Sequence, residues 1–280
     1  GSNDWADAAD AILALRETDT DRLRTAGIKV ILDGSIQGFT AKMDWPGYYT
    51  GTDQGIWMTA PAQLIDICRP FHERGINIHT HCNGTMTIDL WIDTVEQLLI
   101  EHPWLDHRHT VQHCQLTSTA QYRRMAKLGM CANIFTNHIW YWGDEHHDLT
   151  VGPERARRME ACRTAEREGV SFSIHSDANV TPLGHLHTMW CAVNRVTPSS
   201  RVLGPDERIS AASALRAVTL DAAYQLHLDA EFGSIECGKA ADFTVLEDDP
   251  LTVDPMTIKD IGVWGTIVGG TAYEAARPGD

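Results

Sequence analysis

The sequence lacks any hydrophobic run that approaches the roughly 18–20 residues needed to cross a bilayer. It also lacks an opening segment in which positive charges precede an apolar stretch, and its first two residues, Gly-Ser, are typical of a cleaved tag. With 43% hydrophobic and 22% charged residues, its 280 residues have the composition of a globular protein. We therefore expect a cytoplasmic protein without a membrane partner, built as one large α/β domain or as a main domain with a small appendage.

Positive charge is scarce. The chain has 23 Lys and Arg against 38 Asp and Glu, a formal net charge of -15. Because binding to nucleic acids depends largely on Lys and Arg that neutralise phosphates, no nucleic-acid partner is expected. No GxGxxG motif follows a strand and opens a helix, which disfavours a dinucleotide-dependent oxidoreductase.

The seven cysteines show no CxxC spacing, and four of them lie in apolar or helical surroundings: Cys68, Cys131, Cys162 and Cys191. An odd number of scattered cysteines is typical of reduced, buried thiols in an intracellular protein. Histidine, by contrast, is frequent: 14 residues, some of them clustered at predicted strand ends. These clusters are the first indication of a site.

Strands and helices alternate along most of the chain. Short apolar runs predict strands at 27–34, 75–84, 108–115, 129–135 and 170–177, and helices are predicted at 5–24, 60–74, 86–101, 118–128 and 153–168. This alternation predicts βα units with a parallel sheet. Segments 35–55 and 136–152 are rich in aromatic residues without a clear period, so we expect long loops. A helix at 209–226 leads into a tail that alternates like antiparallel strands, which suggests domains at 1–226 and 227–280.

Polar side chains gather where the predicted strands end. His79 and His81 are spaced i, i+2 and so point to one face of a strand, His113 ends the next strand, and Asp177 ends a later one in the segment SFSIHSDANVTPLG. Carboxyl ends of parallel strands meet at one edge of a sheet, where ligands bind. Imidazole and carboxylate groups suit zinc and related divalent ions. Satisfied core histidines and an Asx-turn at Asp177 are the alternative interpretations.

Lys29 lies within the apolar strand at 27–34, where an unpaired ammonium group would be costly. Three explanations stay open. Lys29 can pair with Asp33, it can extend its ammonium group to the rim of the sheet, or it can react with carbon dioxide to form a carbamate whose oxygens bind metal.

The second aromatic segment contains His138 and Trp140, which could form a wall for an apolar or aromatic substituent of a substrate. A packed loop or an oligomer contact explains the same residues equally well. Asn179, close to Asp177, is a further candidate for substrate binding or for positioning the turn, and His79 is a candidate on the sheet.

Five segments together resemble the amidohydrolase superfamily, and within it the amidohydrolase family 3 group that includes N-substituted formamide deformylases: IKVILDGSIQGFTA, INIHTHCNG, TVQHCQ, SIHSDANVTPLG and GSIECGKAADFTVLEDDP. The resemblance implies a TIM-type (β/α) barrel of which this chain holds strands four to eight, followed by a small C-terminal β-sandwich portion. It also implies that Lys29 is a carboxylated bridging lysine, that His81 and His113 are metal ligands, and that Asp177 is both a ligand and the catalytic aspartate. His79 matches no ligand of the family.

Family members carry a first barrel strand with an HxH pair, and nothing before Lys29 supplies one. We therefore expect the chain to be the carboxyl-terminal part of a longer enzyme, completed by a missing N-terminal segment or by a second copy in a homo-oligomer. The implied function is metal-dependent hydrolysis of a non-peptide C–N bond in a small-molecule amide, with one or two divalent ions, zinc being the first choice. The alternative is a catalytically silent module that keeps the fold for structural or assembly purposes.

Overall fold

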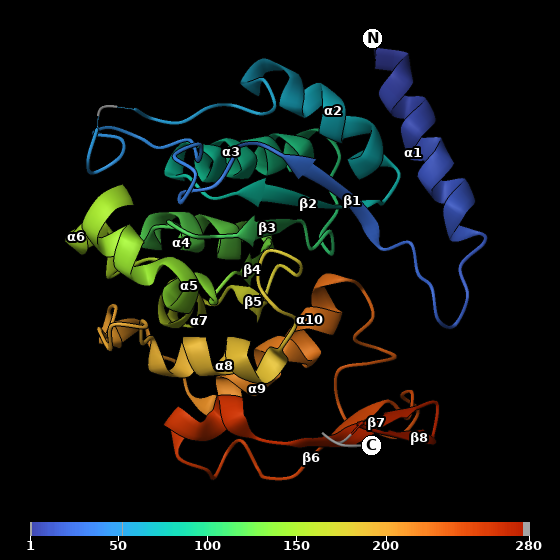
Figure 1. The fold of residues 1–280 in the computed structure, drawn as a ribbon. Helices are drawn as coiled ribbons and strands as arrows, with labels where there is room; N and C mark the ends of the chain where they lie inside the picture. Colours follow the sequence, from blue (N-terminus) through green and yellow to red (C-terminus); the bar gives the residue numbers. More distant parts are fainter. Residues whose placement is uncertain (1, 52, 277–280) are drawn as a thin grey trace.

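A five-stranded parallel sheet forms the centre of the molecule (Figure 1). The computed structural model describes residues 2–51 and 53–276. The strands follow one another in chain order across the sheet: β1 (Gly27–Ile31), β2 (Asn77–Cys82), β3 (Thr110–His113), β4 (Cys131–Ile134) and β5 (Ser171–Ile174). All five strands predicted from the sequence are confirmed. Because each pair is parallel, all five carboxyl ends lie at the same edge.

Helices connect the strands and lie against the sheet. They are α1 (Ser2–Arg16), α2 (Pro61–Glu73), α3 (Thr85–Glu101), α4 (Thr119–Leu128), α7 (Cys162–Glu168), α8 (His185–Asn194), α9 (Ala211–Val218) and α10 (Leu220–Gln225). A capping box starts α4, with Ser118 accepting from the backbone N–H of Gln121 and the Gln121 side chain accepting from Ser118 N–H. Gly129 ends α4 at φ 75°, a left-handed conformation that glycine adopts without strain.

The core lies between the sheet and these helices. Strand residues such as Ile78, Val111 and Ile134 are buried, as are Trp91 on α3 and Trp190 on α8. The four cysteines predicted to be buried are buried free thiols. Within the part of the chain that the structure describes, no helix is both long and apolar enough to cross a membrane.

A second, antiparallel sheet is formed by the tail: β6 (Phe243–Leu246), β7 (Val263–Val268) and β8 (Thr271–Glu274). It lies at the opposite end of the molecule from α1 (Figure 1). A 3-10 helix (Pro255–Asp260) packs against α8, and Trp190 Nε1 donates to the Met256 carbonyl at 2.9 Å. The antiparallel strands predicted for the tail are confirmed.

The prediction of a loop at 136–152 is wrong. The segment forms α5 (His138–Glu145) and a π-helix (His146–Thr150). Burial explains the difference, since His138, Ile139 and Gly143 lie on a buried face of α5, and Gly143 packs so closely that an added Cβ would meet Leu203 at 2.8 Å. The predicted helix at 153–168 is also interrupted: α6 (Pro153–Ala156) and α7 are separate helices. The long segment 35–55 contains no helix or strand among its described residues, as predicted.

A cluster of buried histidines lies at the opposite edge of the sheet from the strands' carboxyl ends. His72 Nδ1 is 2.9 Å from His109 Nε2, and His109 Nδ1 accepts from the backbone N–H of Ile78. His107 accepts from the backbone N–H of His109 and donates Nε2–H to the Leu128 carbonyl. Each ring therefore satisfies its hydrogen bonds as a neutral imidazole. Burial lowers the pKa of His72, His107 and His109.

This cluster makes stability sensitive to acid. The unfolded chain takes up a proton at each histidine below a pKa of about 6.5, whereas the folded chain does not, so the stabilisation is complete above about pH 6.5 and falls as the pH drops. Fully buried His109 alone should remove about 1.4 kcal/mol of unfolding free energy per pH unit below that point, and His72 and His107 should add to the slope. Urea unfolding followed by circular dichroism between pH 8 and pH 5 would measure it.

The exposed His185 supplies the control. Replacing His109 by Gln should flatten the dependence of stability on pH, although it also lowers stability at pH 8, whereas His185→Gln should leave the slope as in the wild type. A urea midpoint that stays constant from pH 8 to pH 5 would contradict the assignment of neutral rings.

Candidate metal centre

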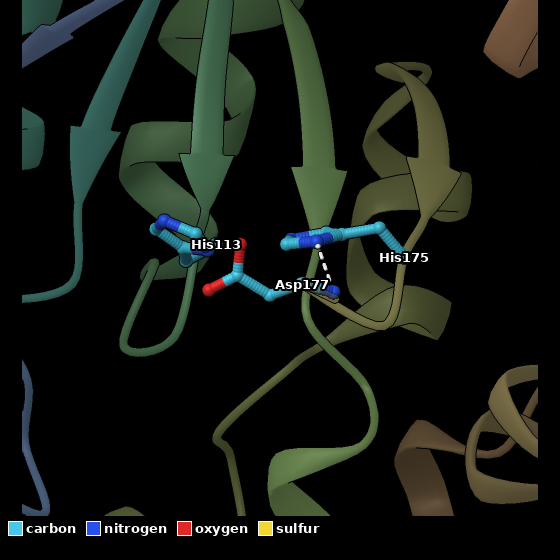
Figure 2. A group of neighbouring side chains, drawn as sticks. All are labelled: His113, His175 and Asp177. Atoms are coloured by element: carbon cyan, nitrogen blue, oxygen red, sulfur yellow. Dashed lines mark hydrogen bonds between the residues drawn. The ribbon is translucent and has the colours of Figure 1, made fainter. Parts of the chain in front are cut away.

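Three strands bring ionisable side chains to one edge of the sheet. His81 is the penultimate residue of β2, His113 is the last residue of β3, and His175 and Asp177 directly follow β5. One ring nitrogen each of His113 and His175 and a carboxylate oxygen of Asp177 all lie within 4.8 Å of one another. Figure 2 shows these side chains converging below the ends of the strands. A group of this composition and spacing could hold a metal ion.

The side chains of His81 and His113 are in contact at this same edge of the sheet. His81 Nδ1 is 2.9 Å from His113 Nε2, and the other nitrogen of His81, Nε2, is 3.0 Å from the Gly34 carbonyl. The Gly34 carbonyl can only accept, which favours a hydrogen on Nε2 and a lone pair on Nδ1, whereas the Asn83 side-chain nitrogen, 3.1 Å from the same Nε2, favours the reverse. Two nitrogens bound to one tetrahedral zinc lie about 3.3 Å apart at the usual Zn–N length. The pair therefore needs little movement to share an ion.

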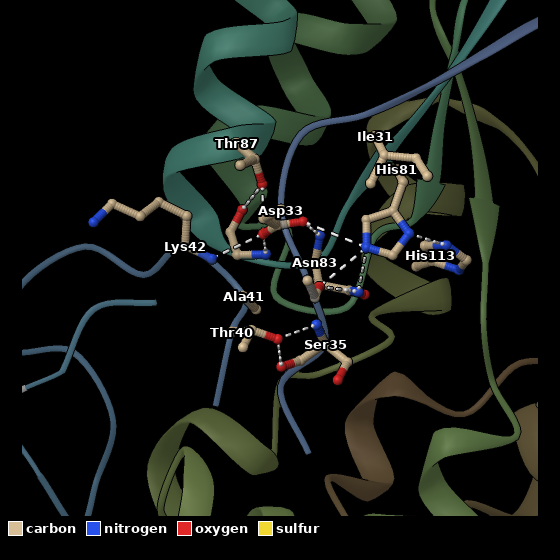
Figure 3. A network of polar contacts seen from close by, with 12 residues as sticks. Ile31, Asp33, Ser35, Thr40, Ala41, Lys42, His81, Asn83, Thr87 and His113 are labelled. Carbon is tan, nitrogen blue, oxygen red and sulfur yellow. Dashed lines mark hydrogen bonds and ion pairs between the residues drawn. The ribbon is translucent and has the colours of Figure 1, made fainter. Parts of the chain in front are cut away.

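Asp33 fixes the surroundings of His81 (Figure 3). Its carboxylate is fully buried and accepts four hydrogen bonds of 2.8–3.1 Å, from the backbone N–H groups of Lys42, Asn83 and Gly84 and from the Thr87 hydroxyl. One of its oxygens is also 3.6 Å from His81 Nε2. Burial raises the pKa of Asp33, and the backbone hydrogen bonds oppose that rise. This single side chain thus connects the end of β1, the loop at residue 42 and the start of α3.

Gly84 allows the two loops to touch. A Cβ at residue 84 would lie 2.0 Å from the Lys42 carbonyl oxygen and 2.4 Å from its carbon, far inside van der Waals contact. Both atoms belong to the backbone and cannot rotate away. The approach that lets Asp33 reach the N–H groups of residues 42 and 84 therefore requires a glycine at this position.

The backbone is unusual at two of the candidate ligands. His113 has φ 76° and Asp177 has φ 48°, in the left-handed region that non-glycine residues rarely adopt. Such conformations are maintained only where the surrounding structure requires them, and they concentrate at functional sites. Burial also lowers the pKa of His113 well below its usual value and that of His175 to about 3, so both rings are neutral, the form that can bind metal.

A cavity of about 400 Å³ adjoins these residues. Asp177 and His175 line it, and the sheet contributes His79 and Gln112. Apolar side chains complete the wall, among them Leu183, Val218 and Leu226. The cavity is large enough for a small organic molecule whose reacting group would lie beside Asp177.

The expected burial of Lys29 is wrong: the residue is exposed, because β1 is an edge strand. The Asp33 carboxylate already accepts the hydrogen bonds described above. No salt bridge from Lys29 to Asp33 occurs within residues 2–51 and 53–276. Lys29 pairs in register with His79. Burial is the main cause that lowers the pKa of His79, His113 and His175, and the positive charge of Lys29 adds to it. Its amino group thus lies near the site while remaining open to solvent.

The four residues predicted to bind substrate have different surroundings. His79 lines the cavity, with Nδ1 2.5 Å from Gln112 Nε2. His138 is buried and bonds Glu160 at 2.9 Å, and Trp140 packs edge-on against Trp190. Asn179 is exposed in the turn after Asp177. Only His79 is therefore brought to the cavity wall, and the roles of all four stay predictions.

Two residues of the site were not singled out from the sequence. His175 stands two positions before Asp177 in the segment SIHSD, where the i, i+2 spacing that drew attention to His79 and His81 was also present. Asp33, in the segment LDGS, was considered only as a partner of Lys29. Its hydrogen bonds reach residues 42 to 87, and no local pattern indicates contacts of that range.

The sequence matches the model of the amidohydrolase family over residues 4–272. The chain belongs to the amidohydrolase family. Among curated relatives it is similar to an N-substituted formamide deformylase of Arthrobacter pascens, with 26% identity over 94% of this chain and 48% of that protein. It is also similar to the putative amidohydrolase YtcJ of Bacillus subtilis (strain 168), with 24% identity over 87% of this chain and 46% of that protein. The amidohydrolase chain thus spans about half the length of the curated relatives it matches.

Solved structures agree on the fold of this amidohydrolase chain. An uncharacterised metal-dependent hydrolase from Pyrococcus furiosus has a TM-score of 0.72 at 22% identity, over 87% of this chain and 50% of that chain. An ochratoxinase from A. niger has a TM-score of 0.65 at 17% identity, over all of this chain and 55% of that chain. The α/β fold with a parallel sheet is therefore that of metal-dependent hydrolases.

Proposed function

We propose that this amidohydrolase chain carries the catalytic edge of a metal-dependent enzyme that hydrolyses a non-peptide C–N bond in a small N-formyl, N-acyl or other amide. The observations that carry the proposal are the pair of His81 Nδ1 and His113 Nε2, 2.9 Å apart, and the cluster of His113, His175 and Asp177, all at the ends of strands. The similarity to a formamide deformylase supports a formyl or acyl amide as the substrate.

The side chains fit a divalent ion, with zinc as the first choice. His81 and His113 present imidazole nitrogens, and Asp177 adds a carboxylate. Lys29 is the fourth candidate ligand. Its exposed amino group is accessible to carbon dioxide, and a carbamate there would add anionic oxygens to a group of donors that is otherwise short of negative charge. With this fourth ligand, one or two ions could be held.

When bound, the ion would lower the pKa of a water molecule and polarise the substrate carbonyl. Asp177 then acts as the general base. It accepts a proton from the attacking water as the new C–O bond forms, and it donates that proton to the nitrogen as the C–N bond breaks. The products are a carboxylic acid, formic acid for a formamide, and an amine. The cavity beside Asp177, with Leu183 and Leu226 in its wall, would take the substituent of the amide.

The same proposal extends to the architecture. We propose that β1 to β5 correspond to strands four to eight of a (β/α) barrel within residues 1–226, and that residues 227–280 form a β-sandwich portion. The half-length match to relatives supports completion by a further N-terminal segment or by a second copy of the chain. The match also favours a second candidate function, a catalytically silent module that keeps the fold.

Metal loading separates the two candidates. The protein, loaded with zinc and desalted, should retain one or two equivalents by mass spectrometry and should hydrolyse members of a panel of N-formyl and N-acyl amines. Dipicolinate should abolish the turnover and readdition of zinc should restore it. His113→Ala should lose zinc, whereas His102→Ala, an exposed residue at the other edge of the sheet, should bind it as the wild type does. Absence of bound metal together with chelator-insensitive turnover, or no turnover at all, would refute the proposal.

A further inference from the structure

The hydrogen bond made by His175 fixes its tautomer. The backbone N–H of Asp177 donates to His175 Nδ1 at 3.1 Å. A backbone amide can only donate, so Nδ1 must present its lone pair to it. A neutral imidazole has one hydrogen, and that hydrogen is therefore on Nε2. The assignment needs no choice between amide rotamers, because the donor belongs to the main chain.

The Nε2–H group of His175 is buried and makes no hydrogen bond of ordinary length and angle among residues 2–51 and 53–276. The Asn133 backbone interacts with the ring and partly opposes the lowering of its pKa by burial. A buried donor without an acceptor is destabilising, and natural structures seldom contain one without a function. His175 lines the cavity together with Asp177, and one of its ring nitrogens lies within 4.8 Å of ligand atoms of Asp177 and His113.

His175 thus differs from His81 although both belong to the same edge. In the tautomer that donates to the Gly34 carbonyl, His81 presents a lone pair on Nδ1, whereas His175 uses its lone pair on the Asp177 amide and presents a hydrogen. A cation could bind Nε2 of His175 only if its hydrogen moved to Nδ1, where the Asp177 amide already donates. The hydrogen that His113 Nε2 donates to His81 Nδ1 can instead move to His113 Nδ1, which has no hydrogen-bond partner among the described residues. His81 and His175 therefore offer opposite functions, one a ligand and the other a donor.

We propose that His175 is a catalytic hydrogen-bond donor and not a metal ligand, and that its Nε2–H binds the carbonyl oxygen of the amide substrate as negative charge develops there. This inference rests on the proposed function. It defines the substrate group that the site recognises as an uncharged acyl group whose oxygen faces His175 and whose carbon lies beside Asp177. A donor that is oriented before the reaction stabilises such charge without reorganisation.

Aromatic packing holds the donor in place. Phe135 stacks on His175 with ring centroids 5.0 Å apart at 26°, and the other neighbours of Phe135 include His138, with centroids 4.0 Å apart. His113 also packs against His175, with ring centroids 5.1 Å apart. A ring fixed by its neighbours and by the Asp177 amide loses little freedom when substrate binds.

Two variants of His175 distinguish a role as hydrogen-bond donor from a role as metal ligand. His175→Phe keeps a planar ring without a donor, and His175→Gln keeps an amide N–H of similar reach. Zinc content should equal that of the wild type in both. For a formamide that the wild type hydrolyses, kcat should fall about 10²–10³-fold in His175→Phe with a small change in KM, and His175→Gln should recover part of the loss. His102→Phe is the matched control and should behave as the wild type in both measurements.

Nitrogen-15 NMR of the wild type tests the tautomer without relying on any variant. Nε2 of His175 should remain protonated after zinc is added, while the ring nitrogens of His81 and His113 shift. Loss of zinc from His175→Phe to the extent seen for His113→Ala, or deprotonation of Nε2 on zinc binding, would overturn the inference, as would a kcat for His175→Phe within about threefold of the wild type. If the wild type hydrolyses no amide, the proposed function fails, and zinc content and tautomer still decide whether His175 is a ligand.

Discussion

Replacing Asp177 by Asn is expected to lower kcat for amide hydrolysis about 10³-fold, since a positioned general base contributes typically 10²–10⁴-fold. Asn has nearly the same shape as Asp but cannot accept the proton of the attacking water or return it to the leaving nitrogen. Asp177 is the one carboxylate in the cluster with His113 and His175, so no described neighbour in that cluster can replace it. Initial rates with a formamide at saturating concentration would measure the effect.

Asp248→Asn is the control for that experiment, because Asp248 is an exposed carboxylate in the tail and its replacement should leave kcat unchanged. Zinc content should be measured for both variants, since Asp177 is proposed to bind the ion as well. If Asp177→Asn retains its zinc and loses activity, the proton transfer is isolated from metal binding. An Asp177→Asn enzyme with more than about one tenth of the wild-type kcat would show that another group is the base.

Replacing Asp33 by Ala is expected to lower the free energy of unfolding by about 3–5 kcal/mol. The change leaves three backbone N–H groups without their acceptor, whereas the Thr87 hydroxyl can still donate to the Gly84 carbonyl. Each unsatisfied group costs about 1–3 kcal/mol, and the costs of groups in one network do not simply add. Zinc affinity should fall as well, because the loop that carries the Gly34 carbonyl, the acceptor for His81, would lose its anchor. Chemical denaturation and zinc titration would measure the two effects.

Asp44 provides a matched comparison. It also contacts the start of α3, accepting from the Thr85 hydroxyl at 2.7 Å, but it is exposed. Asp44→Ala should therefore cost less than about 1 kcal/mol, because water can replace the lost acceptor. Equal destabilisation by Asp33→Ala and Asp44→Ala would show that burial of the carboxylate does not determine the cost of removing it.

The sequence was sufficient to predict the sheet. Segments such as GINIHTH and RHTVQHCQ combine an apolar run with a turn residue or polar end, and local pattern alone indicated five parallel strands. It was less informative for 136–152, where aromatic residues without a clear period suggested a loop. Contacts of Gly143 in α5 with Thr197 and Leu203, which lie 54 and 60 residues later in the chain, make that segment helical and buried. A short stretch of sequence does not reveal contacts between residues so far apart in the chain.

The candidate site could be predicted only in part, for a related reason. His81, His113 and Asp177 stand at strand ends, so topology alone brings them to one edge. The exposure of Lys29 depends on β1 being at the border of the sheet, which the apolar character of its segment did not reveal. The function of His175 depends on which of its nitrogens meets a backbone amide, a matter of side-chain geometry that residue identity does not determine.

The contact between Gly84 and the main chain of Lys42 shows that the site depends on residue 84 having no side-chain carbon. No ionisable group, ligand or aromatic ring makes this contact, yet any larger residue would force the two loops apart and move His81 with them. Natural variation could therefore silence the protein at a position that no inventory of reactive side chains would include. When sequences of this kind are sorted into active and inactive members, residue 84 should be compared together with the histidines.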